Sequence, residues 1–149
     1  VTGATMASFT GLAAARSHVL ARAGWDVEAR GLFGAPPIEV IIGDDAHTTV
    51  LSGLRMLGLG QERVRRVATD AQGRMRIDAF RAALNESSDP VIAIAQAGQL
   101  NTGAIDPVGA MADALAGRPA DVHDARPGRQ PHRGGRAAPR LTPRSWRPR

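Results

Sequence analysis

The chain has 149 residues and a formal net charge of +5, and all nineteen of its basic residues are arginine, because no lysine is present. It also contains no cysteine, which excludes a disulfide framework, a thiolate nucleophile and a cysteine-based metal site. The length suits one domain or a piece of a larger protein, and the lack of a leader or a membrane-spanning apolar run predicts a cytoplasmic protein.

The first third of the chain reads as a helix, a loop and a buried strand. Over residues 5–23, apolar side chains such as Leu12 and Val19 fall on one helical face. The stretch GLFGAPP then breaks the pattern, and residues 38–43 (IEVIIG) form a short β-branched run typical of a buried strand. We expect one αβ unit here.

The same alternation continues to residue 117. Helices are predicted over 44–58, with Asp44 or Asp45 as N-cap, over 77–87, beginning at Asp78, and over 107–117, with Pro107 in its first turn. Strands are predicted over 63–70 and 90–98. Strands alternating with helices predict an α/β domain, a mainly parallel sheet covered by helices on both faces.

Residues 118–149 differ in composition from the rest. They carry nine arginines against two acidic residues, a net charge of +7, whereas residues 1–117 carry ten arginines and twelve acidic residues, a net charge of −2. The segment also holds six prolines, one leucine and no isoleucine or phenylalanine, too little apolar surface to offset the entropy of ordering. We therefore predict a folded domain over 1–117 and a disordered Arg/Pro-rich tail over 118–149.

The opening stretch VTGATMASFTGLAAAR raises the question of a phosphate site. A tight turn at Gly3, Ala4 and Thr5 that runs into a helix leaves backbone N–H groups free to bind an anion. A dinucleotide site like that of short-chain dehydrogenases needs two further close glycines where this chain has Ala7 and Phe9, and its family base is a tyrosine, which the chain lacks. A nucleoside-triphosphate P-loop needs Gly-Lys-Ser/Thr and is excluded without lysine.

Three ordered segments favour a third kind of phosphate. TGATMASFTGLAAAR, GDDAHTTVLSGLRMLGLG and AQAGQLNTGAIDP follow one another about forty to fifty residues apart. Together they resemble the large domain of the group II decarboxylases of amino acids, which depend on pyridoxal 5′-phosphate (PLP) and include the aromatic-amino-acid and glutamate decarboxylases. The resemblance implies a truncated fold-type I PLP-dependent transferase domain, removal of the α-carboxylate of an amino acid, and a homodimer for the full-length protein.

The resemblance also assigns cofactor-binding residues. It places Gly3, Ala4 and Thr5 at the PLP phosphate and His47 against the pyridine ring. Read without the other segments, His47 is simply a residue of a helix's first turn. Asp106, in NTGAIDP, is either a site carboxylate or a residue that fixes the loop, and we favour the structural role.

Two catalytic parts of the family do not follow in this sequence. The family uses a lysine that forms a Schiff base with PLP and an aspartate in a Val-Asp-Ala/Gly-Ala stretch that faces the pyridine nitrogen. Here 122–124 (VHD) resembles the aspartate motif, and no lysine follows, so no catalytic residue is assigned and the chain is expected to be inactive. We interpret the tail as the product of a frameshift near residues 119–124. Residues 128–131 can be encoded by codons that read Trp-Ala-Ala-Ala in the adjacent frame, which resembles the family in this region.

Two alternative functions stay open at this point. In the first alternative, the chain is a fragment of a different fold-type I PLP enzyme, such as a sulfur-removing lyase or an aldolase. In the second, it is a non-catalytic protein that binds nucleic acid through its Arg-rich tail. The tail has no aromatic residue besides Trp146 for base stacking, so nucleic acid is the weaker reading. His123 and His132 fall in the tail, and no metal site is predicted.

Overall fold

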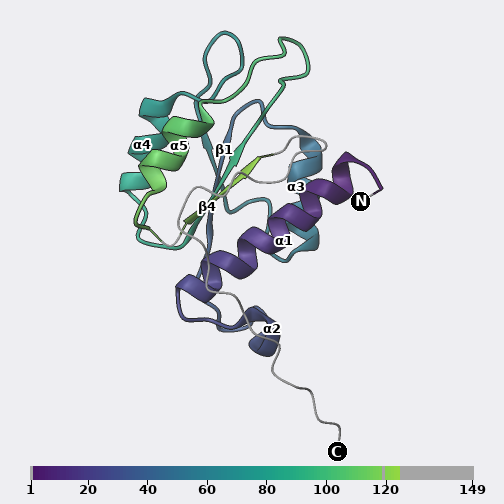
Figure 1. Cartoon of the computed structure of the whole chain (residues 1–149), viewed down its shortest axis with the longest axis vertical. Helices are drawn as coiled ribbons and strands as arrows, with labels where there is room; N and C mark the ends of the chain where they lie inside the picture. The colour runs from purple at the N-terminus through teal and green to yellow at the C-terminus, as the bar shows by residue number, and fades with distance from the viewer. Residues whose placement is uncertain (1, 119, 125–149) are drawn as a thin grey trace, which may run out of the picture.

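A computed structural model of the chain describes residues 2–118 and 120–124. It shows an α/β fold in which helices cover both faces of one parallel sheet (Figure 1), as the sequence predicts. The elements follow in the order α1 (Ala4–Arg22), α2 (Val27–Arg30), β1 (Glu39–Gly43), α3 (Thr48–Met56), β2 (Val64–Val67), α4 (Ile77–Asn85), β3 (Val91–Ala95), α5 (Val108–Leu115) and β4 (Ala120–Asp124).

The sheet has the strand order β2-β1-β3-β4, and every neighbouring pair is parallel. All five residues of β3 are buried, and only the first residue of β1 is partly exposed. These two central strands are the apolar, β-branched runs of the sequence, because a parallel strand covered by helices on both faces has no polar side.

Two apolar cores lie on opposite faces of the sheet. Val40 and Ile42 of β1 join the core formed with α1 and α3, whereas Ile41 joins the core formed with α4 and α5. This division follows from the pleat, since successive side chains of a strand point to opposite faces. The helix that follows the predicted phosphate turn, α1, and the helix that follows His47, α3, therefore cover the same face of the sheet.

The structure corrects the predicted helix starts. Neither Asp44 nor Asp45 caps α3; the N-cap is His47, because the chain turns at Asp44 and Asp45, before the helix begins. The N-cap of α4 is Arg76, which places Asp78 inside the first turn. The short helix α2 was not predicted, and it begins where the Asp26 carboxylate accepts the N–H groups of Glu28 and Ala29.

The boundary predicted at 117/118 is too early. β4 pairs with β3 from Val91↔Ala120 to Ala95↔Asp124, inside the segment that composition assigned to the disordered tail. A parallel pairing needs only backbone groups and an adjacent strand, so five residues join the sheet although the segment as a whole is poor in apolar residues. The rest of the predicted tail, residues 125–149, lies outside the described residues. The predictions that depend on it, disorder, a changed reading frame downstream of residues 119–124 and nucleic-acid binding, therefore stay predictions.

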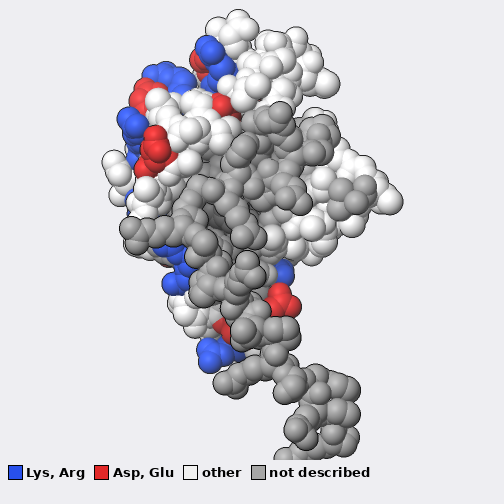
Figure 2. Space-filling view, in the orientation of Figure 1, with Lys and Arg blue, Asp and Glu red and all other residues white. Residues whose placement is uncertain are grey.

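Two surface properties complete the description. None of the helices in the described residues is both long and apolar enough to span a membrane. On the face drawn in Figure 2, basic and acidic side chains are intermingled on the side where α4 lies, and a broad area on the opposite side is uncharged.

Candidate functional site

The N-terminus of α1 is open and has no side-chain cap. Gly3 is the N-cap, with φ at 115°, a conformation that L side chains rarely adopt, and a Cβ added there would meet nothing within 4 Å. The first turn holds no acidic residue, and the exposed Thr5 lies in it. The free N–H groups and the positive end of a nineteen-residue helix make this turn suitable for an anion.

The N-termini of α1 and α3 lie at the same edge of the sheet. A Cβ on Gly53 of α3 would come within 3.1 Å of Leu12 of α1, and one turn further along Arg16 Nη1 donates to the Leu57 carbonyl at 3.3 Å. Because both contacts advance in the same chain direction, the two helices start from the same side and cross, with α1 in front of α3 in Figure 1. At a rise of 1.5 Å per residue, Gly3 lies about 14 Å and His47 about 9 Å before the first contact.

His47 lies directly beyond the carboxyl end of β1, where it caps α3. Its Nδ1 accepts the Thr49 N–H at 3.2 Å and is 2.9 Å from Thr49 Oγ1. Acceptance by Nδ1 leaves the proton of the neutral ring on Nε2. A hydrogen bond to a ring nitrogen lies in the plane of the ring, so this helix-capping role leaves the faces of the exposed imidazole available for stacking.

Asp106 joins two loops at this carboxyl edge. It is 7% exposed, and its Oδ1 and Oδ2 accept the backbone N–H groups of Met75 and Gln96, both at 2.6 Å. Burial raises the pKa of Asp106, and the two hydrogen bonds oppose that rise in part. Both oxygens are used on backbone donors, which supports the structural role rather than that of a site carboxylate.

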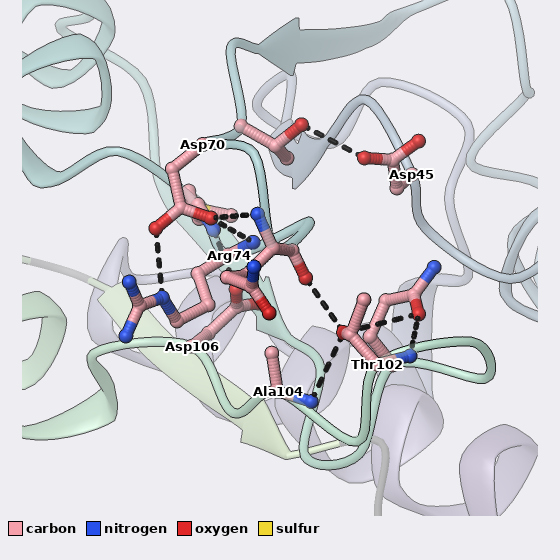
Figure 3. A network of polar contacts seen from close by, with 10 residues as sticks. Asp45, Asp70, Arg74, Thr102, Ala104 and Asp106 are labelled. Atoms are coloured by element: carbon pink, nitrogen blue, oxygen red, sulfur yellow. Dashed lines mark hydrogen bonds and ion pairs between the residues drawn. The ribbon is translucent and has the colours of Figure 1, made fainter.

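Further polar side chains connect the same loops (Figure 3). Thr69 donates to Asp45 Oδ2 at 2.8 Å, and Thr102 donates to the Gln72 carbonyl at 2.7 Å. Asp70 accepts the N–H groups of Gln72 and Arg74 and pairs with the Arg74 guanidinium at 2.7 Å. These bonds bring together the segments that follow β1, β2 and β3.

Sequence reasoning missed Gln96. Its side-chain Oε1 accepts the backbone N–H of His47 at 3.2 Å across 49 positions of the chain. A signal was present, since Gln96 is the first polar residue after the buried run of β3, at the carboxyl end of a parallel strand where ligands bind in α/β folds.

The opposite edge of the sheet holds a cleft of about 450 Å³. It lies at the amino ends of β1 and β2 and before β3, and charged residues of both signs, including Glu39, Arg65 and Glu86, line it. It is separate from the turn at Gly3 and from His47. No group of three or more potential metal-ligating side chains occurs within the described ranges.

Comparisons with known proteins identify relatives with one kind of activity. The cysteine sulfinic acid decarboxylase of Mus musculus is 34% identical over 92 residues, which are 59% of this chain and 19% of that protein. Tryptophan decarboxylase 1 of Oryza sativa subsp. japonica is 32% identical over 118 residues, 75% of this chain and 22% of the relative. The chain thus spans about a fifth of the length of these relatives, and no protein-family model matches it.

Solved structures agree with the sequence relatives. The crystal structure of mouse CSAD superposes with a TM-score of 0.72 at 28% identity, covering 83% of this chain and 26% of that one. The structure of Oryza sativa TDC with PLP superposes with a TM-score of 0.69 at 28% identity, covering 80% and 26%. The described fold therefore corresponds to about a quarter of each of those chains.

Proposed function

Since the chain belongs by sequence and fold to the group II PLP-dependent amino-acid decarboxylases, we propose that it is the part of their large domain that binds the cofactor. The whole protein would remove the α-carboxylate of an amino acid and act as a homodimer. The observation that carries this proposal is that the open N-terminus of α1 and the imidazole of His47 lie at one edge of the sheet, on one face.

The residues of this edge suit two parts of PLP. The backbone N–H groups at Gly3, Ala4 and Thr5, with the Thr5 hydroxyl, would bind the phosphate, and His47 would stack on the pyridine ring. When bound, PLP supplies the electron-withdrawing ring that accepts the electrons released as the carboxylate leaves.

The register of β4 supports the resemblance of residues 122–124 to the family's aspartate motif. Asp124 is paired with Ala95, the last residue of β3, and so lies at the carboxyl end of the sheet. His47 follows β1 at the same end. We propose that Asp124 corresponds in backbone register to the aspartate of that motif.

The covalent anchor is the part that this sequence does not supply. The family holds PLP through a lysine amine, and the chain contains no lysine. We propose that the chain binds PLP weakly and without a covalent bond, and that it does not turn over. We also propose a frameshift near residues 119–124, and the nucleotide sequence of the gene tests it. If no single-base change restores an Asp-x-His-Lys reading downstream, the frameshift proposal is contradicted.

The binding proposal is tested by titrating the chain with PLP, with pyridoxal and with inorganic phosphate while following backbone amide resonances. PLP and phosphate should shift the amide resonances of Gly3, Ala4 and Thr5, and PLP should also shift the resonances of the His47 ring. Pyridoxal, which lacks the phosphate, should bind more weakly than PLP. Borohydride should trap no adduct on an internal residue. Unmoved α1 amides at millimolar PLP would contradict the proposal.

Matched variants separate specific binding from a general effect on the helix. Thr5→Ala removes the hydroxyl proposed to contact the phosphate and should weaken binding of both PLP and phosphate. His47→Ala should weaken binding of PLP alone. Thr10→Ala is the control, because Thr10 is exposed one turn later in α1, where its hydroxyl donates to the Met6 carbonyl.

A further inference from the structure

We propose that Gln96 is a positioning residue that holds His47 in place for the pyridine ring, while Asp106 fixes Gln96 itself. The inference rests on the proposed function, because it takes His47 as the residue that contacts the ring. It goes beyond that function by assigning roles to a glutamine and an aspartate that touch neither the phosphate turn nor the imidazole.

The bond between Gln96 and His47 meets a need of the helix start. His47 is the N-cap of α3, and the N–H groups at a helix N-terminus have no partner within the helix. The Gln96 amide oxygen accepts the His47 N–H at 3.2 Å. Adjacent strands lie about 4.8 Å apart, so a side chain of glutamine length spans from the end of β3 to the turn after β1.

Gln96 can serve as a fixed point because its own backbone is held twice. Its N–H donates to Asp106 Oδ2 at 2.6 Å, and its carbonyl accepts the Asp106 N–H at 2.9 Å. The second oxygen of Asp106 accepts the Met75 N–H at 2.6 Å, which ties the pair to the segment after β2. Only the side chain of Gln96 is left to reach His47.

The turn that carries His47 is held from its other side as well. The Asp44 N–H donates to the Val67 carbonyl, and Arg66 Nη1 donates to the Asp44 carbonyl, both at 3.0 Å. Thr69 donates to the Asp45 carboxylate at 2.8 Å. Without Gln96, the turn keeps these bonds toward β2 and loses the side-chain bond toward β3, so His47, the residue nearest the helix, gains freedom.

The experiment compares the full chain with Gln96→Ala, Gln96→Glu and Gln72→Ala. Amide hydrogen exchange of His47, the ¹⁵N resonances of its ring, and the affinities for PLP and for inorganic phosphate are measured for each. Gln96→Ala should speed exchange of the His47 amide about five-fold, the effect of losing one ordinary hydrogen bond. The substitution should also lower the affinity for PLP several-fold and leave the affinity for inorganic phosphate unchanged.

Two variants serve as controls. Gln96→Glu keeps an acceptor oxygen and should preserve the slow exchange. Gln72 takes part in the neighbouring network through its backbone N–H and carbonyl, so Gln72→Ala should change none of the readouts.

Unchanged exchange and ring resonances of His47 in Gln96→Ala would overturn the proposal. So would faster exchange with an unchanged ratio of PLP to phosphate affinity, because Gln96 would then hold the turn without serving the ring. If the unmodified chain binds no PLP at all, the proposed function fails, and the exchange rate alone decides whether Gln96 holds His47.

Discussion

The two edges of the sheet are held together by different kinds of polar contact. At the carboxyl edge, the side chains of Gln96, Asp106 and Thr102 bond to backbone groups of neighbouring loops, and the Asp70 carboxylate bonds to backbone N–H groups of its own loop. At the amino edge, the main polar feature is Arg65, whose guanidinium pairs with Glu39 at 2.7 Å and with Glu86 at 2.8 Å beside an open cleft.

The difference is that side chains at the carboxyl edge fix the backbone of loops, whereas the main contacts at the amino edge are ion pairs between side chains. A side chain that bonds to backbone fixes the path of a loop, and a buried backbone N–H that loses its partner is costly. Ion pairs in contact with solvent contribute little. The bonds from side chain to backbone at the amino edge, from Arg65 to the Ala83 carbonyl and from Arg118 to the Leu84 and Ser87 carbonyls, hold the end of α4 rather than a loop at the carboxyl ends of the strands. The carboxyl edge is therefore the edge at which ligand-binding loops can be held in one arrangement.

The largest effect is expected at Asp106. Asp106→Ala leaves the N–H groups of Met75 and Gln96 without an acceptor and should lower the free energy of unfolding by about 3 kcal/mol. Urea unfolding followed by circular dichroism measures it. Asp113→Ala, on the exposed side of α5, is the control and should stay within about 0.5 kcal/mol of the unmodified chain. Equal losses in both variants would show that the two backbone bonds of Asp106 do not determine the cost of the substitution.

A smaller effect is expected at the amino edge. Arg65→Met removes both ion pairs and the bond to the Ala83 carbonyl, and it should cost about 1 kcal/mol, because the side chain is 35% exposed. The loss should shrink in 1 M salt, which screens the pairs. Arg81→Met, at an exposed position of α4, should have almost no effect. A salt-independent loss would show that Arg65 acts through packing.

Thr102 tests a single bond between two loops of the carboxyl edge. Thr102→Val removes the hydroxyl that donates to the Gln72 carbonyl at 2.7 Å and should cost about 0.5 kcal/mol, because the position is exposed. Thr102→Ser keeps the hydroxyl and should behave like the unmodified chain. Faster amide exchange confined to the segments around Gln72 and Thr102 would locate the loss, whereas exchange raised throughout the sheet would contradict a local role.

The smallest effects concern pH, and two carboxylates of the same edge should act in opposite directions. Burial raises the pKa of Asp106 above 3.8, so its contribution to stability falls as pH rises from 3.8 through the raised value. The backbone N–H of Arg74 is the main cause that lowers the pKa of Asp70, so its contribution is lost as pH falls from 3.8 through the lowered value.

Asp106→Asn and Asp70→Asn each remove one of these contributions, and unfolding between about pH 6 and pH 3 measures them. Relative to Asp106→Asn, the unmodified chain should lose stability as pH rises. Relative to Asp70→Asn, it should lose stability as pH falls. Two differences of the same sign would contradict this assignment.

The sequence by itself determined the fold class and every element except α2 and β4. The β-branched run at 38–43 and the apolar run at 90–98 became the two buried central strands, and the periodic segments between them became helices. These features are local, because the spacing of apolar residues along a short segment predicts whether it forms a buried strand or a helix with one apolar face. The resemblance to the PLP-dependent decarboxylases was likewise readable from three short segments and is supported by the relatives.

Only the tertiary structure decided how the candidate site is held. Composition averaged over 118–149 hid β4, since the strand depends on the exposed edge of β3 rather than on its own apolar content. The partners of His47 and Asp106 lie 49 and 31 positions away, in Gln96 and Met75. Such bonds exist because the strand order sets β1 between β2 and β3, and no local pattern specifies which strands become neighbours.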